Sequence, residues 1–493
     1  MYRFTRSLLL VAVVASAYPL SAGLPDRTLA DLVEKAEFEK AIQLIESGHD
    51  VNASQPDGTT PLIWAAYHAN SSLVELLLKN GADPVAKNRY NISGLAVACG
   101  NGDAMSASLL LDAGADPKDS IGEGETMLML AARSGNPDLV EKLLQLGTDV
   151  NREIPGGQTA LMFAAAEGSA ETVSLLLEAG ADPLAKSRHG FTSIHFAARA
   201  GHNEVIRLLV KSGVDVDLAI QWTGPGGFRS PRNRSSPLIF ALENAEFEAA
   251  VMLLELGADP NDMRTGYAPL HTMTWVRKAH LGDSADPEPV VHGRMSRRDM
   301  LLQLIESGAD VNQRVPNGRT TRGKVTEKGC TPFFMAADRG DLEMMQLLVE
   351  HGADPHIPNE DGVTPLMIAT GLGRGPENDE AGTQEDALAA VAYCIELGMD
   401  VNTVDANGET AMHGAAYGQW PQMVRLLHEN GADISVWNRL NKWKWSPLLI
   451  AQGYRQGNFK PSYDTIEAIE AIMAEQGVTL RFDPPADQLG YDD

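Results

Sequence analysis

The chain has 493 residues and a formal net charge of −26, because 66 aspartate and glutamate residues outnumber 40 lysine and arginine residues. Nucleic-acid binding depends mainly on basic side chains that neutralise phosphates, so this charge balance excludes a general nucleic-acid binder. The chain has three cysteines, Cys99, Cys330 and Cys394, and so small and odd a number gives no disulfide framework. We expect them to be small buried apolar residues.

The first segment, residues 1–22, has the layout of a secretory signal peptide. Arg3 and Arg6 precede an apolar run at residues 8–15, and small residues follow it, with possible cleavage after Ala17 or Ala22. The run is too short to cross a bilayer, and no other stretch is long and apolar enough to do so. The sequence therefore predicts a periplasmic or secreted protein without a membrane span.

A tripeptide Gly-Ala-Asp, or a close variant of it, recurs along the chain. From Gly48 to Gly213 each copy follows the previous one by 33 residues (81−48, 114−81, 147−114, 180−147, 213−180). Self-similarity at a fixed period of this size is typical of solenoids, in which each unit packs only on its neighbours. The sequence therefore predicts one repeat architecture with a core distributed along it.

Each repeat contains the signals of a turn and two antiparallel helices. Thr60-Pro61 is an N-cap followed by proline at the first helical position, as in the stretch Gly58-Thr59-Thr60-Pro61-Leu62-Ile63-Trp64-Ala65-Ala66. Val173, Leu176 and Leu177 give the second helix an apolar face, and the glycine that follows suits a left-handed C-terminal cap. The motif resembles the ankyrin repeat over nearly the whole mature chain, which implies protein partners and no cofactor.

The predicted fold is an all-α repeat solenoid of ankyrin repeats, with a turn plus two antiparallel helices in each of about ten repeats between capping units. We divide the chain into a capping repeat at residues 23–57 and regular repeats at 58–221. Insertion-bearing repeats follow at 222–407, the last repeats and a C-terminal cap at 408–479, and a disordered acidic tail at 480–493.

The period slips after Gly213, where the steps become 44, 51, 44 and 46 residues before returning to 33 (257−213, 308−257, 352−308, 398−352, 431−398). The flanking motifs place the insertions around 221–234 and 317–328 in the fingers, meaning the turns between successive repeats. Those around 280–295 and 373–385 join the two helices of one repeat. Inserted loops are often binding elements, so we look for function here.

Two inserted fingers are basic in an otherwise acidic chain. They supply most of the partner-binding candidates, which are Arg229, Arg232, Arg234, Arg319, Arg322 and Lys324, together with the aromatic residues Trp222 and Trp275. One interpretation is a clamp for an acidic protein surface, because arginine and aromatic side chains dominate binding hot spots. The other is a pair of flexible hairpins kept basic to match the acidic flank of the protein itself. The sequence favours neither.

Catalytic chemistry has little support in the sequence. His271, His280 and His292 suffice in number for a zinc site, but no ligand spacing supports one, and His271 belongs to the repeat motif together with His195 and His413. We therefore predict a monomeric, non-catalytic protein–protein interaction scaffold of an exported bacterial type, with no catalytic, cofactor or metal residues. The alternatives are a metal-dependent enzyme built from the inserted loops and a secreted effector or inhibitor.

Overall fold

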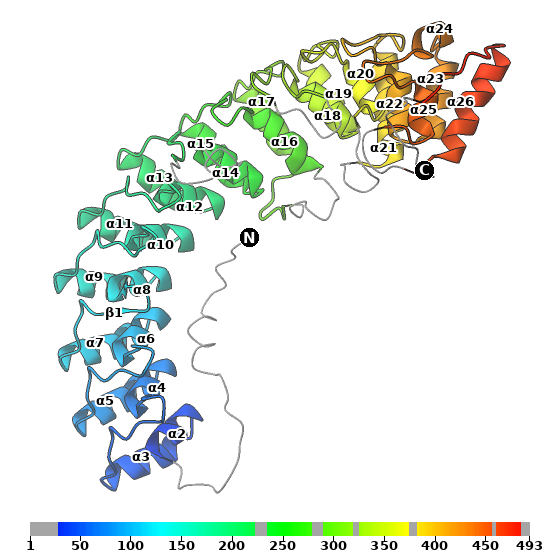
Figure 1. Ribbon diagram of the computed structural model, residues 1–493. Helices are drawn as coiled ribbons and strands as arrows, with labels where there is room; N and C mark the ends of the chain where they lie inside the picture. The colour runs from blue at the N-terminus through cyan, green and yellow to red at the C-terminus, as the bar shows by residue number, and fades with distance from the viewer. Residues whose placement is uncertain are drawn as a thin grey trace, which may run out of the picture. The chain divides into compact units, whose positions relative to one another are not determined.

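The computed structural model describes residues 28–221, 234–278, 289–318, 325–373, 382–455 and 460–484. It is an all-α repeat solenoid of helix pairs, which confirms the predicted fold class (Figure 1). The chain divides into two compact units, residues 1–233 and 234–493, which are described separately below. The predicted signal peptide and most of the predicted acidic tail lie outside the described residues.

The described part of the first unit consists of six helix pairs. After the opening pair, the first helix of each pair is the one that follows a finger. Its helices are α2 (Leu29–Glu34), α3 (Phe38–Glu46), α4 (Pro61–Tyr67), α5 (Ser71–Lys79), α6 (Gly94–Asn101), α7 (Ala104–Asp112), α8 (Met127–Ser134), α9 (Pro137–Gln145), α10 (Ala160–Glu167), α11 (Ala170–Glu178), α12 (Ser193–Arg199) and α13 (Asn203–Lys211). One finger also contains a short antiparallel hairpin of β1 (Ser120–Ile121) and β2 (Glu125–Thr126).

The second unit repeats the same plan. Its helices are α14 (Pro237–Glu243), α15 (Phe247–Glu255), α16 (Pro269–Arg277), α17 (Arg297–Glu306), α18 (Pro332–Asp338), α19 (Leu342–Glu350), α20 (Pro365–Ala369), α21 (Gln384–Glu396), α22 (Ala411–Tyr417), α23 (Pro421–Glu429), α24 (Ile434–Trp437), α25 (Pro447–Ala451) and α26 (Tyr463–Glu475). Among the described residues, no helix combines the length and the apolar character that a membrane crossing requires.

Local sequence accounts for where the helices begin and end. Thr60 caps α4 by accepting the N–H of Ile63 at 3.3 Å, and Pro61 takes the first helical position, as the motif predicts. After α5, Gly81 adopts a left-handed conformation with φ 88°, and the N–H of Ala82 donates to the carbonyl of Leu77 at 2.9 Å. This closure satisfies carbonyls that the helix end would otherwise leave unpaired.

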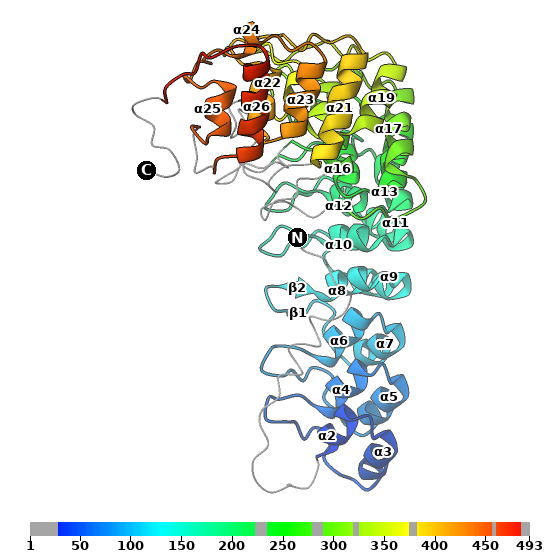
Figure 2. The same ribbon diagram turned by 90° about the vertical axis from the view of Figure 1, so that its right-hand side faces the viewer.

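Equivalent helices stack on one another within each unit. The first helices α4, α6, α8, α10 and α12 form one layer, and the second helices α5, α7, α9, α11 and α13 form another. Ala65 and Ala66 are fully buried between first helices, because their small side chains allow a close approach. Figure 2 shows that the fingers of this unit lie on the side of the first helices.

An asparagine amide joins each of several repeats to the next. The side-chain N–H of Asn151 donates to the carbonyl of Gly180 at 2.9 Å, and its side-chain oxygen accepts the N–H of Asp182 at 2.8 Å. Its partners therefore lie in the Gly-Ala-Asp turn of the following repeat. The same pair of bonds is made by Asn52, Asn261, Asn312 and Asn402.

The insertions lie where the slipped spacing predicts, between α13 and α14, α16 and α17, α17 and α18, and α20 and α21. The predicted end of the fourth insertion, at residue 385, is wrong, because α21 begins at Gln384 and its N-cap is Thr383. The hydroxyl of Thr383 accepts the N–H of Asp386 at 3.1 Å, and the Asp386 carboxylate accepts the backbone N–H of Thr383 at 2.9 Å. This reciprocal cap starts the helix earlier than hydrophobic spacing indicates.

We predict that Asn151→Asp weakens the first unit by about 1 kcal/mol, because it removes the bond to Gly180 and places a carboxylate against a carbonyl oxygen. The measurement is urea unfolding followed by circular dichroism, with hydrogen exchange of the Asp182 amide. The control is Asn317→Asp, the same chemical change at an exposed side chain for which no hydrogen bond to the described residues is seen. Equal unfolding midpoints for the two variants would show that the asparagine pair does not hold the repeats together.

Candidate functional site

Only two of the predicted partner-binding residues fall within the described residues. Trp222, Arg229, Arg232, Arg319, Arg322 and Lys324 lie outside them. Arg234 is exposed and has a positive φ of 72°. Trp275 is half-buried on α16 and meets the ring of Tyr267 edge-on, with 5.5 Å between ring centroids.

Trp275 belongs to a row of residues that sequence reasoning missed. It is the seventh residue of its first helix, and that position also carries Tyr67, Arg133, Arg199 and Tyr417. We call this seventh position of the first helices the finger-facing row, because Arg133, Trp275 and Tyr417 each contact their own finger. Trp275 meets Tyr267, and Arg133 meets Glu125. The signal was present in the sequence, since the position follows the cap at a fixed interval.

Arg133 shows best what the row presents. Its guanidinium donates to both oxygens of Glu125, at 2.9 and 3.4 Å, and its central carbon lies 5.4 Å from the ring centroid of Phe163 on α10. The arginine is thus held on two sides while about a quarter of its side chain stays exposed. Held arginines beside aromatic rings are typical of binding hot spots, because little side-chain entropy is lost when a partner binds.

Large and small residues alternate along this row in the first unit. Tyr67, Arg133 and Arg199 occupy alternate repeats, and Gly100 and Ala166 lie between them, with all five half-buried. The large side chains are therefore spaced two repeats apart.

In the second unit, the side chain of Tyr417 in the finger-facing row is buried. The hydroxyl of Tyr417 donates to the buried carboxylate of Glu409 at 2.9 Å, and Asn441 donates to the same oxygen at 2.9 Å. Arg455 donates to the Tyr417 carbonyl at 2.8 Å. Burial raises the pKa of Tyr417 well above its usual value and lowers the pKa of Arg455 to about 10. This cluster is part of the core and offers little surface to a partner.

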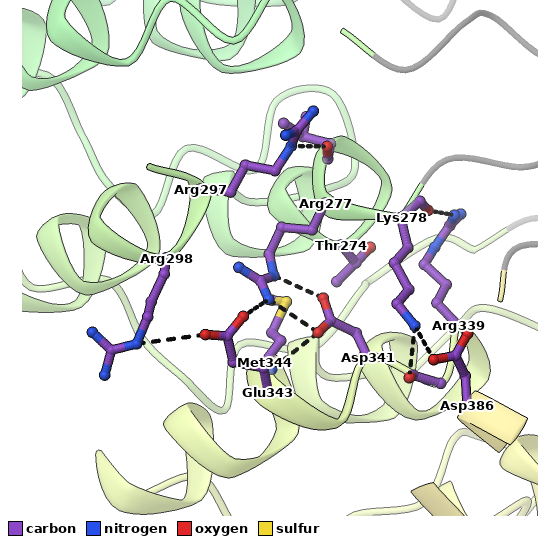
Figure 3. A network of polar contacts seen from close by, with 12 residues as sticks. Thr274, Arg277, Lys278, Arg297, Arg298, Arg339, Asp341, Glu343, Met344 and Asp386 are labelled. Carbon is purple, nitrogen blue, oxygen red and sulfur yellow. Dashed lines mark hydrogen bonds and ion pairs between the residues drawn. The ribbon is translucent and has the colours of Figure 1, made fainter. Parts of the chain in front are cut away.

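A second constellation lies where α16 ends, opposite the turn between α18 and α19 (Figure 3). Arg277 makes a bidentate ion pair with Asp341 at 2.7 and 3.1 Å, and both side chains are less than a tenth exposed. The same guanidinium also donates to Glu343 at 2.7 Å. Although burial opposes its charge, these carboxylates raise the pKa of Arg277.

The next residue, Lys278, joins three repeats. Its ammonium donates to the Gly340 carbonyl at 3.1 Å and forms an ion pair with Asp386 of the following repeat at 2.9 Å, and its own carbonyl accepts from Arg339 at 2.6 Å. Burial raises the pKa of Asp386, but the Lys278 ammonium and the backbone N–H of Thr383 bring it below its usual value. The network therefore fixes the ends of both long helix-connecting segments on one short turn.

Long and short helix connections alternate along the second unit. The long ones, at residues 278–296, 370–383 and 452–462, are separated by short turns at 244–246, 339–341 and 418–420. Among the described residues, two of these long connections contact a neighbouring short turn or the helix that begins after it. Glu248, at the start of α15, accepts the N–H groups of Arg294 and Met295 at 2.7 and 3.2 Å, and Gln419 donates to the Lys460 carbonyl at 2.8 Å.

Of the histidines considered for a metal site, His271 serves the fold. The Nδ1 atom of His271 accepts the backbone N–H of Ala268 at 3.2 Å, and Nε2 faces the Cys330 carbonyl at 3.4 Å, so both ring nitrogens have partners. Nδ1 of His195 and of His413 accepts the backbone N–H of Thr192 and of Thr410, as the repeat motif predicts. Burial lowers the pKa values of His271 and His413 to about 4, which keeps them neutral.

No side-chain cluster in the described part of the chain is arranged to hold a metal ion. Groups of three or more histidine, cysteine, aspartate and glutamate residues suited to one are absent there. His292 contacts Glu246 at 3.0 Å, away from His271, and His280 lies outside the described residues. The three cysteines are buried and free of disulfides, as expected, and burial raises their pKa values, that of Cys394 to about 12.

We predict that Arg277→Met destabilises the second unit by about 3 kcal/mol, because it leaves the Asp341 carboxylate buried without its charged partner. Adding Asp341→Asn should recover part of this loss, since asparagine still caps α19 and carries no charge. Urea unfolding of both variants measures this. Arg298→Ala is the control, because Arg298 is half-exposed and lies 3.6 Å from Glu343. If Arg277→Met costs no more than this control, the network does not brace the connections.

Comparison with known proteins identifies the repeat. The model for ankyrin repeats in three copies matches residues 32–121, 88–155, 128–220 and 294–376, and the single ankyrin-repeat model matches 407–439. Ankyrin repeat family A protein 2 of Mus musculus is 43% identical over 58 residues, 12% of this chain and 19% of its own length. Neurogenic locus notch homolog protein 1 of Homo sapiens is 34% identical over 99 residues, 20% of this chain and 4% of its own length.

These matches span less than a fifth of the length of the curated relatives. Among solved structures, the human ASB11 ankyrin repeat domain aligns with 48% of this chain and all of its own length, at 23% identity and a TM-score of 0.41. The relatives named here are mammalian. Because the family models match more than half of the 493 residues, the protein belongs to the ankyrin-repeat family.

Proposed function

We propose that this protein is an exported, non-catalytic scaffold that binds another protein through its fingers and the finger-facing row. Ankyrin repeats are generally protein-interaction modules, which supports the class of function. The observation that carries the proposal is the half-buried, alternating set Tyr67, Arg133 and Arg199 in the first unit. Tyrosine and arginine are the residue types enriched in hot spots, and Arg133 is held in place by Glu125 and Phe163.

The inserted basic fingers are proposed as a further contact. Arg229, Arg232 and Arg234 in one finger, and Arg319, Arg322 and Lys324 in the other, would favour a partner with an acidic surface. Complementary charge mainly raises the association rate and the specificity. The partner is one protein molecule bound by a monomer, outside the cytoplasm, where the scaffold could also act as an effector or inhibitor.

We predict that a photoreactive amino acid at position 133 or 199 forms a discrete adduct with one partner protein in the native compartment. Arg133→Ala combined with Tyr67→Ala should weaken capture of that partner by about tenfold, since hot-spot truncations cost more than about 1 kcal/mol each. Circular dichroism should remain unchanged.

Matched controls come from the second helices. Arg207 on α13 is half-exposed and pairs with Glu204, and Lys142 on α9 pairs with Asp112. A photoreactive residue at position 207 should give no adduct, and Arg207→Ala with Lys142→Ala should leave capture intact. Adducts of equal yield at 133 and 207 would rule out the finger-facing row as the binding surface.

Export is proposed from the first residues of the sequence. Two arginines followed by an apolar run and small residues are the features that direct secretion. An acidic surface favours solubility and disfavours contact with anionic membranes. The bacterial character of the protein rests on the same features and on the long insertions.

We predict that the mature protein begins at Tyr18 or Gly23, as measured by intact mass after cell fractionation. Replacing Leu9 and Val11 with aspartate should leave the full-length chain in the cytoplasm, because it interrupts the apolar run. Thr5→Ser, which leaves the run intact, is the control. A wild-type protein that retains its first residues and stays in the cytoplasm would refute export.

A further inference from the structure

The tip of each finger requires a left-handed backbone conformation two residues before the N-cap of the first helix. Positive φ angles occur there in every described repeat whose finger precedes a capped first helix. Glycine occupies this position at Gly58, Gly124, Gly157, Gly190, Gly266, Gly329, Gly362 and Gly408. Glycine is the expected choice, because a side chain costs roughly 1–2 kcal/mol in this conformation.

Three fingertips depart from glycine, and two of them carry a cation. Asn91, with φ 61°, is the substitution that the left-handed region tolerates best. Arg234 and Lys444 have φ values of 72° and 67°. Neither arginine nor lysine is among the residue types that tolerate the left-handed region well. Strain of this kind persists where the surrounding structure holds it in place, and it often marks functional sites.

Packing explains why Lys444 is possible but not why it is present. At four of the eight glycine fingertips an added Cβ would crowd the next finger, as at Gly157, where it would lie 2.8 Å from the Lys186 carbonyl oxygen. No further finger follows Lys444 among the described residues, so its side chain meets no such neighbour. The backbone strain remains, and within the described residues the ammonium of Lys444 makes no hydrogen bond or ion pair.

The rest of this finger is also basic. We call residues 438–446 the terminal finger; it contains Arg439, Lys442 and Lys444 and no carboxylate. All three cations are exposed, in a chain where acidic residues outnumber basic ones by 66 to 40. Like charges repel one another, so a bound group of opposite charge would relieve repulsion within this finger.

Two tryptophans pack against each other in this finger. Trp445 is buried, and Trp443 stacks on it with 5.9 Å between ring centroids and 25° between ring planes. The ammonium of Lys442 lies 5.6 Å from the centroid of Trp443 and donates to the side-chain oxygen of Asn407 at 3.2 Å. Trp443 is half-buried, so part of an aromatic surface is exposed between two lysines.

We propose that the terminal finger binds an acidic peptide segment of a partner protein, with Lys442 and Lys444 pairing carboxylates and Trp443 contacting an apolar side chain between them. The proposal deepens the scaffold function and rests on it. The chemistry fits because lysine ammonium groups pair with carboxylates while an anchored aromatic ring supplies apolar contact area. A polyanion such as nucleic acid is disfavoured by the net charge of −26.

The test uses the full-length chain and a short fluorescein-labelled peptide in which glutamate alternates with leucine. Fluorescence anisotropy should show binding of this peptide and none of its glutamine counterpart. Carbodiimide coupling, which joins carboxylates directly to amines, should attach the peptide to Lys442 or Lys444, as mapped by mass spectrometry. Lys442→Glu with Lys444→Glu should weaken binding by about tenfold or more.

Two further variants separate a binding role from a structural one. Lys444→Gly should weaken binding while raising resistance to urea, because it removes the cation and relaxes the backbone. Lys118→Glu with Lys211→Glu makes the same change of charge at exposed lysines of the first unit and should leave binding unchanged.

Any of three results would overturn the proposal. The first is an equal loss of binding in the Lys118 and Lys211 control, which would mean unspecific attraction. The second is tighter binding of a single-stranded DNA oligonucleotide that is lost with Lys442→Glu and Lys444→Glu. The third is coupling of Lys442 or Lys444 to Asp487, Asp492 or Asp493 of the same chain without peptide. Each would leave the adducts at positions 133 and 199 unaffected, so the scaffold function is judged separately.

Discussion

The structure depends on the fact that one repeat completes the hydrogen bonding of the next. The asparagine pair shows this most directly, because Asn52 bonds to Gly81 and Asp83, which lie 29 and 31 residues further on. For Asn261 the corresponding separations are 47 and 49 residues, and the two bonds are still made. The contact between neighbours is therefore kept whatever the length of the intervening segment, so extra residues must leave the stack.

In the second unit, long and short helix connections alternate from one repeat to the next. A repeat with a long helix connection is followed by one with a short turn, and two of the long connections contact a neighbouring short turn or the helix that begins after it. The ion pair of Arg277 with Asp341 is buried and bidentate, a geometry in which the attraction can offset the loss of hydration. The pair lies at the start of an inserted segment, so it stabilises the chain at the point where it departs from the repeat.

The proposed binding residues follow another principle, because they are variations at positions that the repeat fixes. The seventh residue of the first helix and the fingertip residue recur at constant spacing from the cap, and both differ in type from one repeat to another. In the finger-facing row the choice of Tyr67, Arg133 or Arg199 costs little, because these positions are half-buried. At the fingertip, Lys444 replaces the usual glycine and strains the backbone. Such strain is a stronger indication of a functional site than a change at a half-buried position.

The sequence by itself determined the period, the helix pairs and the sites of insertion, because capping residues, prolines and glycines act through local backbone chemistry. It also placed His195, His271 and His413 correctly in the turn motif. Tertiary structure decided the partners of side chains, such as Arg277 with Asp341, 64 residues apart, and Arg133 with Phe163. Such pairings depend on which faces meet after stacking, and in a chain with 106 charged side chains many pairs satisfy charge alone. Of the predicted binding residues, structure described only Arg234 and Trp275, and it assigned Trp275 to a row that spacing from the cap defines.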